Sequence, residues 1–291
     1  MTQGRVGRTL TDVVSGLEQS ALLDDFSNTV TAVVHGLTES DTIKNALSGA
    51  WLGHALHPLL TDLPIGFWMS AVTLDIVGGK AAEGGADLLL GLGNLSALGT
   101  AATGLADWSD SNDGAEKRVG VVHGVANVAG LALMAGSWLA RRSGARGTGK
   151  ALGMMGIGVA GASAYLGGHL LMARGLGVTH AGYGVDEEVG EWTDVAAAAD
   201  LVEGKPMKVS AKNVEVMLLK QDGEVRALAN LCGHAGGPLH KGDVGEGDIT
   251  CPWHGSRFQL VDGCVLRGPA SMPQPAFVAR VRGDRVEVRA A

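Results

Sequence analysis

Two pairs of cysteine and histidine residues near the C-terminus have the spacing of metal ligands. Cys232 and His234 are separated by one residue, and Cys251 and His254, which follow after sixteen intervening residues, are separated by two. Such a set binds either one zinc ion in a tetrahedral site or an iron–sulfur cluster in which histidines replace two cysteines. The four side chains therefore predict a metal centre, and the residues around them separate the two alternatives.

The residues that flank the two pairs favour the iron–sulfur cluster. Glycine and proline follow both pairs, and a further loop rich in these residues comes later: Gly236, Gly237, Pro238, Gly255 and Gly268-Pro269-Ala270. With this pattern, the stretch from about residue 190 to residue 291 resembles the Rieske [2Fe-2S] family. The resemblance implies a compact β domain that holds a two-iron cluster.

The resemblance also implies a role for each ligand. Cys232 and Cys251 would bind one iron of the cluster, and His234 and His254 would bind the other. Neutral imidazoles remove negative charge that thiolates would add, so the cluster is reduced more easily than an all-cysteine cluster. We expect the histidine end to lie outward, where electrons are exchanged, and Pro269 to cover the cluster from the third loop.

Three positions indicate the ferredoxin type of Rieske domain rather than the quinol-oxidising type. The quinol-oxidising type has a disulfide between its ligand loops, but the corresponding residues here are Gly237 and Trp253. It also has a tyrosine that donates a hydrogen bond to a ligand sulfur, where this chain has Phe258. Ser256 is retained and can still donate to sulfur. Fewer donors stabilise the reduced cluster less, so we expect a low reduction potential.

The sequence upstream of this region is apolar enough to span a membrane. The chain has 291 residues, of which 46% are hydrophobic and 18% charged. Four windows with few charges approach the length of about 20 residues that crosses a hydrocarbon layer, at about 59–78, 86–106, 119–140 and 151–173. A buried bundle in a soluble protein is the alternative, but four such windows in series favour four transmembrane helices.

The first window carries a second pattern. His57-Pro58 and Pro64-Ile65-Gly66 occur at its start. This pattern resembles an uncharacterised bacterial family of four-helix membrane domains over about residues 50–173.

Histidines gather at one end of the expected bundle. If the four helices alternate in direction, His54, His57, His123 and His169 fall near one membrane face. A pair drawn from the last three is a candidate for binding a b-type haem, because ionisable residues at membrane depth are often functional. The alternative is hydrogen bonding between helices, with aspartates as the acceptors: Asp62, Asp75 and Asp107.

The composition changes along the chain and predicts four parts. We expect an amphipathic or tail segment at 1–48, a four-helix transmembrane domain at 49–174, a glycine-rich linker at 175–190 and a Rieske domain at 191–291. Turn signals at Asp222-Gly223 and Gly283-Asp284 lie between short strands of the last part. The expected fold class is an α-helical membrane bundle followed by an all-β domain.

The distribution of charge predicts the orientation of this multi-pass protein in the cell membrane. The loop between the third and fourth helices carries Arg141, Arg142, Arg146 and Lys150 without an acid, and such loops stay in the cytoplasm. This places the Rieske domain on the extracytoplasmic side. Met1–Gly16 is polar and predicts no cleavable signal peptide, while Arg141-Arg142 is a candidate twin-arginine export signal.

These features predict one-electron transfer at a membrane. The Rieske domain would move on its linker between redox donor and acceptor proteins or small electron carriers, with the lipid bilayer as its support. The alternatives are a redox- or metal-linked sensor or scaffold subunit, and a two-centre carrier with haem. A net charge of −7 without a basic patch argues against nucleic acid.

An oxygenase is excluded on the length of chain that remains. A Rieske oxygenase needs a further domain with a mononuclear iron held by two histidines and a carboxylate. Only 21 residues follow Ala270. We therefore expect an electron carrier or a subunit of an oxidoreductase complex, and not a complete enzyme.

Overall fold

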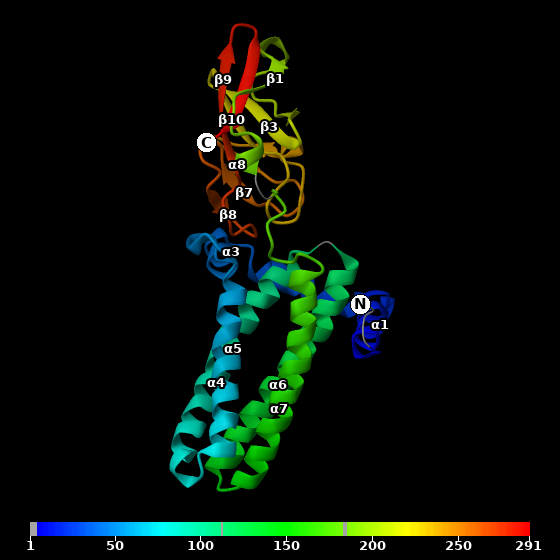
Figure 1. The fold of residues 1–291 in the computed structure, drawn as a ribbon, viewed down its shortest axis with the longest axis vertical. Coiled ribbons are helices and arrows are strands. Elements are labelled where there is room, and N and C mark those ends of the chain that lie inside the picture. The colour runs from blue at the N-terminus through cyan, green and yellow to red at the C-terminus, as the bar shows by residue number, and fades with distance from the viewer. Residues whose placement is uncertain (1–4, 112, 183–184) are drawn as a thin grey trace. The chain divides into compact units, whose positions relative to one another are not determined.

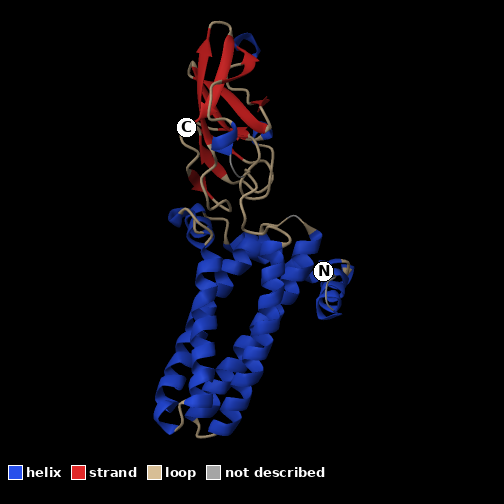
Figure 2. Ribbon diagram, viewed as in Figure 1, coloured by secondary structure: helices blue, strands red, loops and turns tan. Residues whose placement is uncertain are grey.

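A computed structural model describes residues 5–111, 113–182 and 185–291 of the chain. It divides into two compact units. The helical unit contains the chain up to Thr38 together with Leu56–Leu176, and the β-rich unit contains Glu39–Ala55 together with Gly177–Ala291. All strands of the described residues belong to the second unit (Figure 2). The fold class expected from the sequence is confirmed.

The long helices of the helical unit are α4 (Leu56–Val77), α5 (Glu83–Ser109), α6 (Gly114–Arg142) and α7 (Arg146–Met172) (Figure 1). All four are long and apolar enough to cross a membrane. They contain the four predicted windows and extend beyond most of their ends. Pro64, expected near the helix start, lies well inside α4.

Glycines allow the long helices to pack closely around tryptophan rings. A Cβ atom on Gly93 of α5 would lie 2.4 Å from the Trp68 ring of α4, and one on Gly120 of α6 would lie 2.2 Å from the Trp108 ring. The two indole rings therefore occupy space that a side chain at either glycine position would fill. Small residues serve this purpose between membrane helices, where packing must replace the hydrophobic effect as the driving force.

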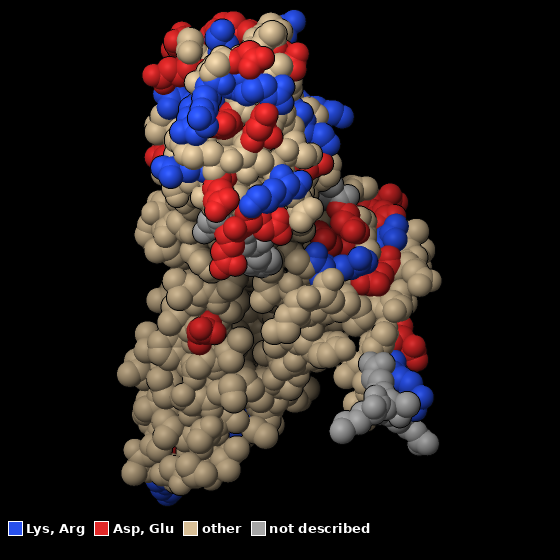
Figure 3. All heavy atoms as spheres, turned by 45° about the horizontal axis from the view of Figure 1, so that its top comes forward, with Lys and Arg blue, Asp and Glu red and all other residues tan. Residues whose placement is uncertain are grey.

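The outer surface of these helices is apolar. In the windows that qualify as spans, only 17–28% of the residues are buried inside the structure. Figure 3 shows a surface over the long helices that is nearly free of charged side chains. Large apolar side chains are exposed on every span, among them Leu59, Leu88, Leu95, Val128 and Met155. Such a continuous apolar surface is stable in lipid and not in water.

The expected N-terminal segment 1–48 divides between the two units. Helices α1 (Arg5–Glu18) and α2 (Asp24–Leu37) pack on the helical unit, and Val14 of α1 is buried with Val119 and Leu170. Arg118 donates to Asp24 at 2.7 Å and to the Glu18 carbonyl at 2.7 Å. The amphipathic pattern therefore reflects packing on neighbouring helices; residues 1–4 lie outside the described residues.

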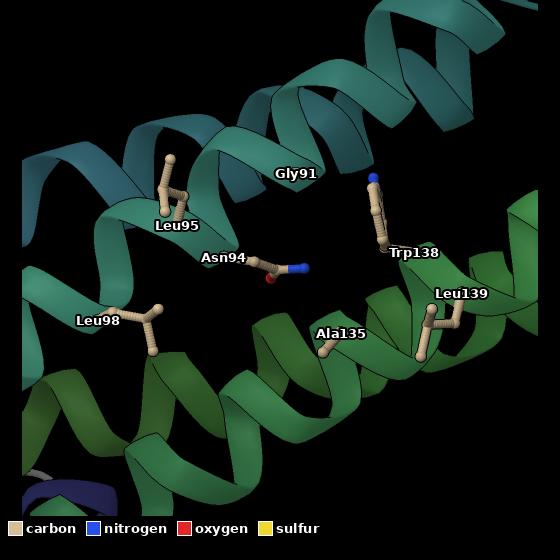
Figure 4. Close-up of a pocket in the computed structure, with 7 residues that line it drawn as sticks. All are labelled: Gly91, Asn94, Leu95, Leu98, Ala135, Trp138 and Leu139. Carbon is tan, nitrogen blue, oxygen red and sulfur yellow. The ribbon is translucent and has the colours of Figure 1, made fainter.

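A cavity of about 320 Å³ opens between α5 and α6 (Figure 4). Its lining is apolar apart from the amide of Asn94, whose Oδ1 accepts a hydrogen bond from Trp68 Nε1 at 3.1 Å. The described lining residues include none of the histidines considered for haem: Gly91, Asn94, Leu95, Leu98, Ala135, Trp138 and Leu139. The cavity marks a looser contact between helices rather than the expected histidine site.

Arg141, which the sequence placed in a basic loop, is buried within the helical unit. Its side chain is 0% exposed, and it binds both oxygens of Asp75 and, at 3.3 Å, Asp87 Oδ1. Arg146 donates to Asp87 at 3.0 Å, and Lys150 donates to the Asp75 carbonyl at 3.0 Å. The basic residues thus neutralise acids of α4 and α5, and a buried Arg141 is a poor twin-arginine signal.

Two antiparallel sheets form the β-rich unit. The six-stranded sheet has the order β1-β10-β9-β4-β3-β2, with bounds Thr193–Ala197, Arg285–Ala290, Ala276–Arg282, Glu224–Ala229, Val214–Gln221 and Met207–Ala211. The four-stranded sheet contains β5 (Asp243–Val244), β6 (Asp248–Thr250), β7 (Arg257–Gln259) and β8 (Val265–Arg267). Both predicted hairpins are confirmed, as β3–β4 and β9–β10.

Strand β3 lies between two cores. Because side chains of a strand alternate between its faces, Val216 and Leu218 pack into one cluster while Met217 and Leu219 pack into the other. All four are 0% exposed. The second cluster also contains the two candidate ligand cysteines. The candidate site is therefore built against β3, a strand whose central residues are fully buried.

The structure differs from the expected linker at 175–190. The boundary between the units falls after Leu176, and Ala181, Val185 and Val189 pack into the core of the β-rich unit. The short helix α8 (Val185–Glu188) lies in this segment. These residues therefore belong to the β-rich unit and do not supply the expected tether; residues 183–184 lie outside the described residues.

We predict that Arg141 is critical for stability. Arg141→Leu leaves Asp75 charged and buried without its partner, which costs about 3–5 kcal/mol in the free energy of unfolding. The neighbouring Arg142 is exposed and lies over the Trp138 ring at 4.1 Å, so Arg142→Leu should cost only about 0.5–1 kcal/mol. Thermal unfolding of the purified protein in detergent checks both values. Equal losses in the two variants would contradict the assignment.

Candidate iron–sulfur site

Two similar loops carry the candidate ligands. The loop with Cys232 follows β4, and the loop with Cys251 connects β6 to β7. In each loop the carbonyl of the cysteine accepts a hydrogen bond from a glycine four residues later, Gly236 at 2.8 Å and Gly255 at 3.1 Å. Both glycines have positive φ, 77° and 70°, which other residues rarely adopt. The glycines noted in the sequence thus form matching tight turns.

Each turn directs backbone N–H groups at its cysteine sulfur. The N–H groups of His234 and Ala235 donate to Cys232, and those of Trp253 and His254 donate to Cys251. Hydrogen bonds to a thiolate stabilise its charged form. The glycines shape the turns, and the residues that precede each glycine donate.

The two cysteine side chains are buried together. Cys232 is 1% exposed and Cys251 is 2% exposed. A hydrogen bond between the two thiols lowers the pKa of Cys251 to about 7 and raises the pKa of Cys232. The pair therefore readily loses one proton near neutral pH, and a metal that binds both sulfurs displaces the second.

The two candidate histidines converge beside the cysteine pair. The Nδ1 atoms of His234 and His254 lie 3.1 Å apart, and their rings meet at an interplanar angle of 84°. Two imidazoles on one metal ion take a similar separation when each metal–nitrogen bond is about 2.1 Å. Burial, followed by the charges of His254, Lys44 and His180, lowers the pKa of His234 to about 3. His234 is thus neutral, which is the form that binds metals.

This arrangement fits a two-iron cluster. Within the described ranges no three side chains of His, Cys, Asp or Glu gather around one point. The donors instead form a thiol pair and an imidazole pair, which supply two ligands at each end of a binuclear centre. Both cysteines are buried while both histidines are half-buried, so the imidazole end lies nearer the surface, as expected.

The surroundings of the pairs explain the missing disulfide and tyrosine. A Cβ atom on Gly237 would lie 2.7 Å from Cys251 Sγ and 3.1 Å from Trp253, so only glycine fits there. Phe258 is 0% exposed and packs in the apolar cluster around the site. Ser256 is also fully buried, and its Oγ accepts the Ala270 N–H at 2.9 Å. Because Ser256 accepts this bond, it keeps its own hydroxyl proton to donate, as a bond to sulfur requires.

Two supports of the site have no signature in the sequence. Gln274 is 1% exposed; it accepts the Gly233 N–H at 2.9 Å and donates to the carbonyls of Ala229 and Leu231. It thereby fixes the first ligand loop to the end of β4. Arg267 donates to the Gly255 carbonyl at 3.1 Å and so ties the loop before Pro269 to the second ligand loop. Neither Gln274 nor Arg267 belongs to a sequence motif. Each supports the site only because the fold places it beside a ligand loop.

The histidines of the helical unit occupy separate environments. His57 Nδ1 lies 3.0 Å from the Thr100 carbonyl, and a Cβ atom on Gly104 would lie 2.4 Å from its ring. His123 Nδ1 lies 2.9 Å from the Ser163 carbonyl, and a Cβ atom on Gly167 would lie 3.0 Å from its ring. Each ring thus occupies a notch left by a glycine on the neighbouring helix.

The other two histidines of this group are not part of such an arrangement. His169 Nε2 lies 2.9 Å from Glu18 Oε1, which also binds Arg174 at 3.0 Å. His54 Nδ1 lies 3.2 Å from the Ala55 carbonyl in the β-rich unit. Interhelical hydrogen bonding, the alternative to haem, does occur for His57 and His123, but with backbone carbonyls rather than the expected aspartates. His57 and His123, which have matching surroundings, are the pair considered further for haem.

Comparisons with protein families agree with both parts of the chain. Residues 191–279 match the Rieske [2Fe-2S] domain, and residues 53–180 match a predicted membrane protein domain, DUF2231. Together with the donor pairs described above, the first match decides between the two metals considered for the site. The chain contains a [2Fe-2S] domain rather than a zinc site.

Individual relatives each match about a third of the chain. The ferredoxin component of the naphthalene 1,2-dioxygenase system of Pseudomonas aeruginosa is 29% identical over 98 residues, which cover 34% of this chain and 94% of the ferredoxin. Apoptosis-inducing factor 3 of Mus musculus and of Homo sapiens is 33% and 34% identical over 96 residues, which cover 33% of this chain. That match spans only 16% of the length of either factor.

A solved structure matches a similar share of the chain. The ferredoxin of carbazole 1,9a-dioxygenase from Nocardioides aromaticivorans IC177 is 29% identical, with a TM-score of 0.33, and the match covers 34% of this chain and 98% of the ferredoxin. The Rieske domain match and the naphthalene dioxygenase ferredoxin relative support an electron-carrier role. By its two matching domains, the chain joins a membrane domain of the DUF2231 family to a Rieske [2Fe-2S] domain of the ferredoxin type.

Proposed function

We propose that this protein is a membrane-anchored one-electron carrier whose cluster is held by Cys232, Cys251, His234 and His254. The observation that carries the proposal is the division of these donors into a buried thiol pair and an imidazole pair nearer the surface. A bound [2Fe-2S] cluster supplies reversible one-electron chemistry at such a site. The four long apolar helices anchor it in the lipid bilayer.

The chain prepares the site for this role in two ways. Backbone N–H groups donate to both sulfurs, which stabilises negative charge on the thiolates and on the reduced site. The fixed loops keep the donors in place in both redox states, so little reorganisation accompanies the transfer. The half-buried imidazole end gives the electron a short path to the surface.

We infer that the partners are redox donor and acceptor proteins or small electron carriers. The relative with most of its length matched is the ferredoxin component of a dioxygenase system. A ferredoxin-type domain fixed to a membrane would serve partners at the membrane surface. A redox sensor remains distinguishable from a carrier, because a sensor would bind a partner according to the state of the cluster without turning over electrons.

We predict that Cys251→Ser abolishes the cluster. Serine removes a thiolate that the cluster requires, so the rhombic EPR signal of the reduced protein should be lost and the iron content should fall. The third cysteine offers a matched control: Cys264 is exposed and lies outside both ligand loops, so Cys264→Ser should keep signal and iron. EPR and iron analysis of the purified full chain decide the matter. An unchanged signal in Cys251→Ser would reject the ligand assignment.

A b-type haem between His57 and His123 is a second candidate, and it would make the protein a two-centre carrier. One observation supports it. Each ring has its Nδ1 fixed by a backbone carbonyl, which is the usual support of a metal-bound histidine. Asn127 now occupies His123 Nε2 at 3.0 Å and would have to turn away.

A visible spectrum tests this candidate. If the pair binds haem, the dithionite-reduced protein should show a sharp α-band, and His57→Ala should remove it. His169→Ala is the matched control and should keep the band, because His169 is engaged by Glu18. Broad iron–sulfur bands alone in the wild-type protein would eliminate the haem and leave the cluster as the redox centre.

We further propose that the β-rich unit faces the extracytoplasmic side. The end of α6 and the start of α7 support this orientation, because the four basic residues there favour the cytoplasm. Three of the four also bind acids or a carbonyl of α4 and α5. These contacts do not alter the preference of positive residues for the cytoplasmic side, which depends on the number of such residues near the ends of the spans.

Cys264 is a natural probe of this orientation. In intact cells a membrane-impermeant maleimide should label Cys264, whereas a Ser143→Cys variant carrying Cys264→Ser should be labelled only after permeabilisation. A hydrogen bond to Asp262 raises the pKa of the Cys264 thiol, so the reaction should be faster at mildly alkaline pH. Asp262→Asn should speed it at neutral pH. Labelling of Ser143→Cys alone in intact cells would reverse the orientation.

A further inference from the structure

Residues 39–55 belong to the β-rich unit, although the whole helical bundle separates them from its strands in the sequence. They contain helix α3 (Asp41–Ser48), which begins after Ser40 and ends at Gly49. Gly49 has a φ of 82°, the left-handed conformation in which glycine commonly ends a helix. The segment is therefore a defined element of this unit, and it immediately precedes the first long helix.

One face of α3 is fastened to the third loop of the iron–sulfur site. Asn45 Oδ1 accepts the Gly268 N–H at 2.8 Å, and Asn45 Nδ2 donates to the Leu266 carbonyl at 3.0 Å. One turn earlier, Asp41 Oδ1 accepts from Arg267 Nε at 2.7 Å. The helix thus binds three consecutive residues of the chain that leads to Pro269.

The contact between α3 and this loop is close. Ser48 is 3% exposed, and a Cβ atom on Gly268 would lie 2.7 Å from its Oγ. Arg267, bound by Asp41, also donates to the carbonyl of Gly255, the residue after His254. Through these contacts α3 is linked to both the third loop and the second ligand loop.

Lys44 lies on the same face of α3 as these side chains. It is 4% exposed, an unusual degree of burial for a lysine. Asp41 and Asn45 on this face bind Arg267 and Gly268, and Arg267 reaches the Gly255 carbonyl next to His254. Lys44 is therefore buried on the face of α3 that docks beside the second ligand loop.

We propose that α3 is a cap on the iron–sulfur site, and that it raises the reduction potential by holding the Lys44 ammonium beside the histidine pair. The proposal rests on the proposed function, because it requires a cluster bound by the four donors. Reduction adds one electron from the donor protein, and no bond is made or broken. A buried positive charge stabilises the added negative charge, since screening by water is weak there. This opposes the low potential expected from the missing tyrosine.

A redox titration followed by EPR tests the role of Lys44. Lys44→Met keeps the length of the side chain but removes its charge, so the midpoint potential should fall. Lys44→Arg should keep most of the wild-type potential. Thr42 is exposed on the same helix, and Thr42→Ala should leave the potential unchanged. Equal potentials for Lys44→Met and wild type, with the EPR signal intact, would overturn the proposal.

A second variant tests whether the helix holds the lysine in place. Asn45→Ala combined with Ser48→Phe removes two hydrogen bonds and places a ring against Gly268, without changing any charge. The potential should fall as in Lys44→Met. Hydrogen exchange in residues 41–48 of the full chain in detergent should quicken about tenfold or more, with or without a cluster. Faster exchange without a change of potential would overturn the proposal.

The outcomes separate the two proposals. If the wild-type protein shows no rhombic EPR signal, the proposed function fails. If the signal is present and the potential does not depend on Lys44 or on docking of α3, the carrier function stands and the cap alone is rejected.

Discussion

The β-rich unit depends on the stabilisation of two buried cysteine sulfurs. Cys232 and Cys251 are almost inaccessible to water, and thiolates in such a place need hydrogen-bond donors close by. Two turns of the same design supply backbone N–H groups to each sulfur. The turns in turn require a left-handed glycine four residues after each cysteine. Gln274, Arg267 and the third loop then hold the two turns against each other.

The helical unit faces a similar constraint, because the lipid around it cannot form hydrogen bonds with polar side chains. Polar side chains inside the bundle are satisfied by other groups of the unit, because lipid offers no hydrogen bonds. Arg141 binds Asp75 and Asp87, while His57 and His123 bind carbonyls of neighbouring helices. Outside, the spans present apolar side chains. The arrangement explains why Arg141 occurs within the spans together with the two aspartates that bind it.

The two units are interleaved along the chain. The β-rich unit is assembled from residues before the first long helix and residues after the last one. Three covalent connections, at Thr38–Glu39, Ala55–Leu56 and Leu176–Gly177, therefore join the units. Completion of the site, including the docking of α3, requires the chain on both sides of the bundle to be present. This interleaving makes the helical bundle an inserted element of the chain that forms the redox site.

The sequence by itself determined the features that depend on local pattern. The lengths of the apolar windows fixed the four long helices, because the thickness of a bilayer sets their size. Alternating residues and two-residue turns fixed the hairpins β3–β4 and β9–β10, and the spacing of cysteine and histidine with their glycines indicated the iron–sulfur domain. Each of these signals lies within a short stretch of chain, where geometry follows directly from residue type.

Only the tertiary structure determined the contacts between residues that are far apart in the sequence. The pairing of Arg141 with Asp75, the support by Gln274 and the docking of α3 on Gly268 bring together side chains far apart in the sequence. A buried lysine or amide has no local pattern, since its role comes from the neighbours that the fold provides. For the same reason residues 39–48 read as tail, residues 49–55 as part of the membrane domain and residues 175–190 as linker, yet residues 39–55 and the described residues from Gly177 to Gly190 belong to the β-rich unit.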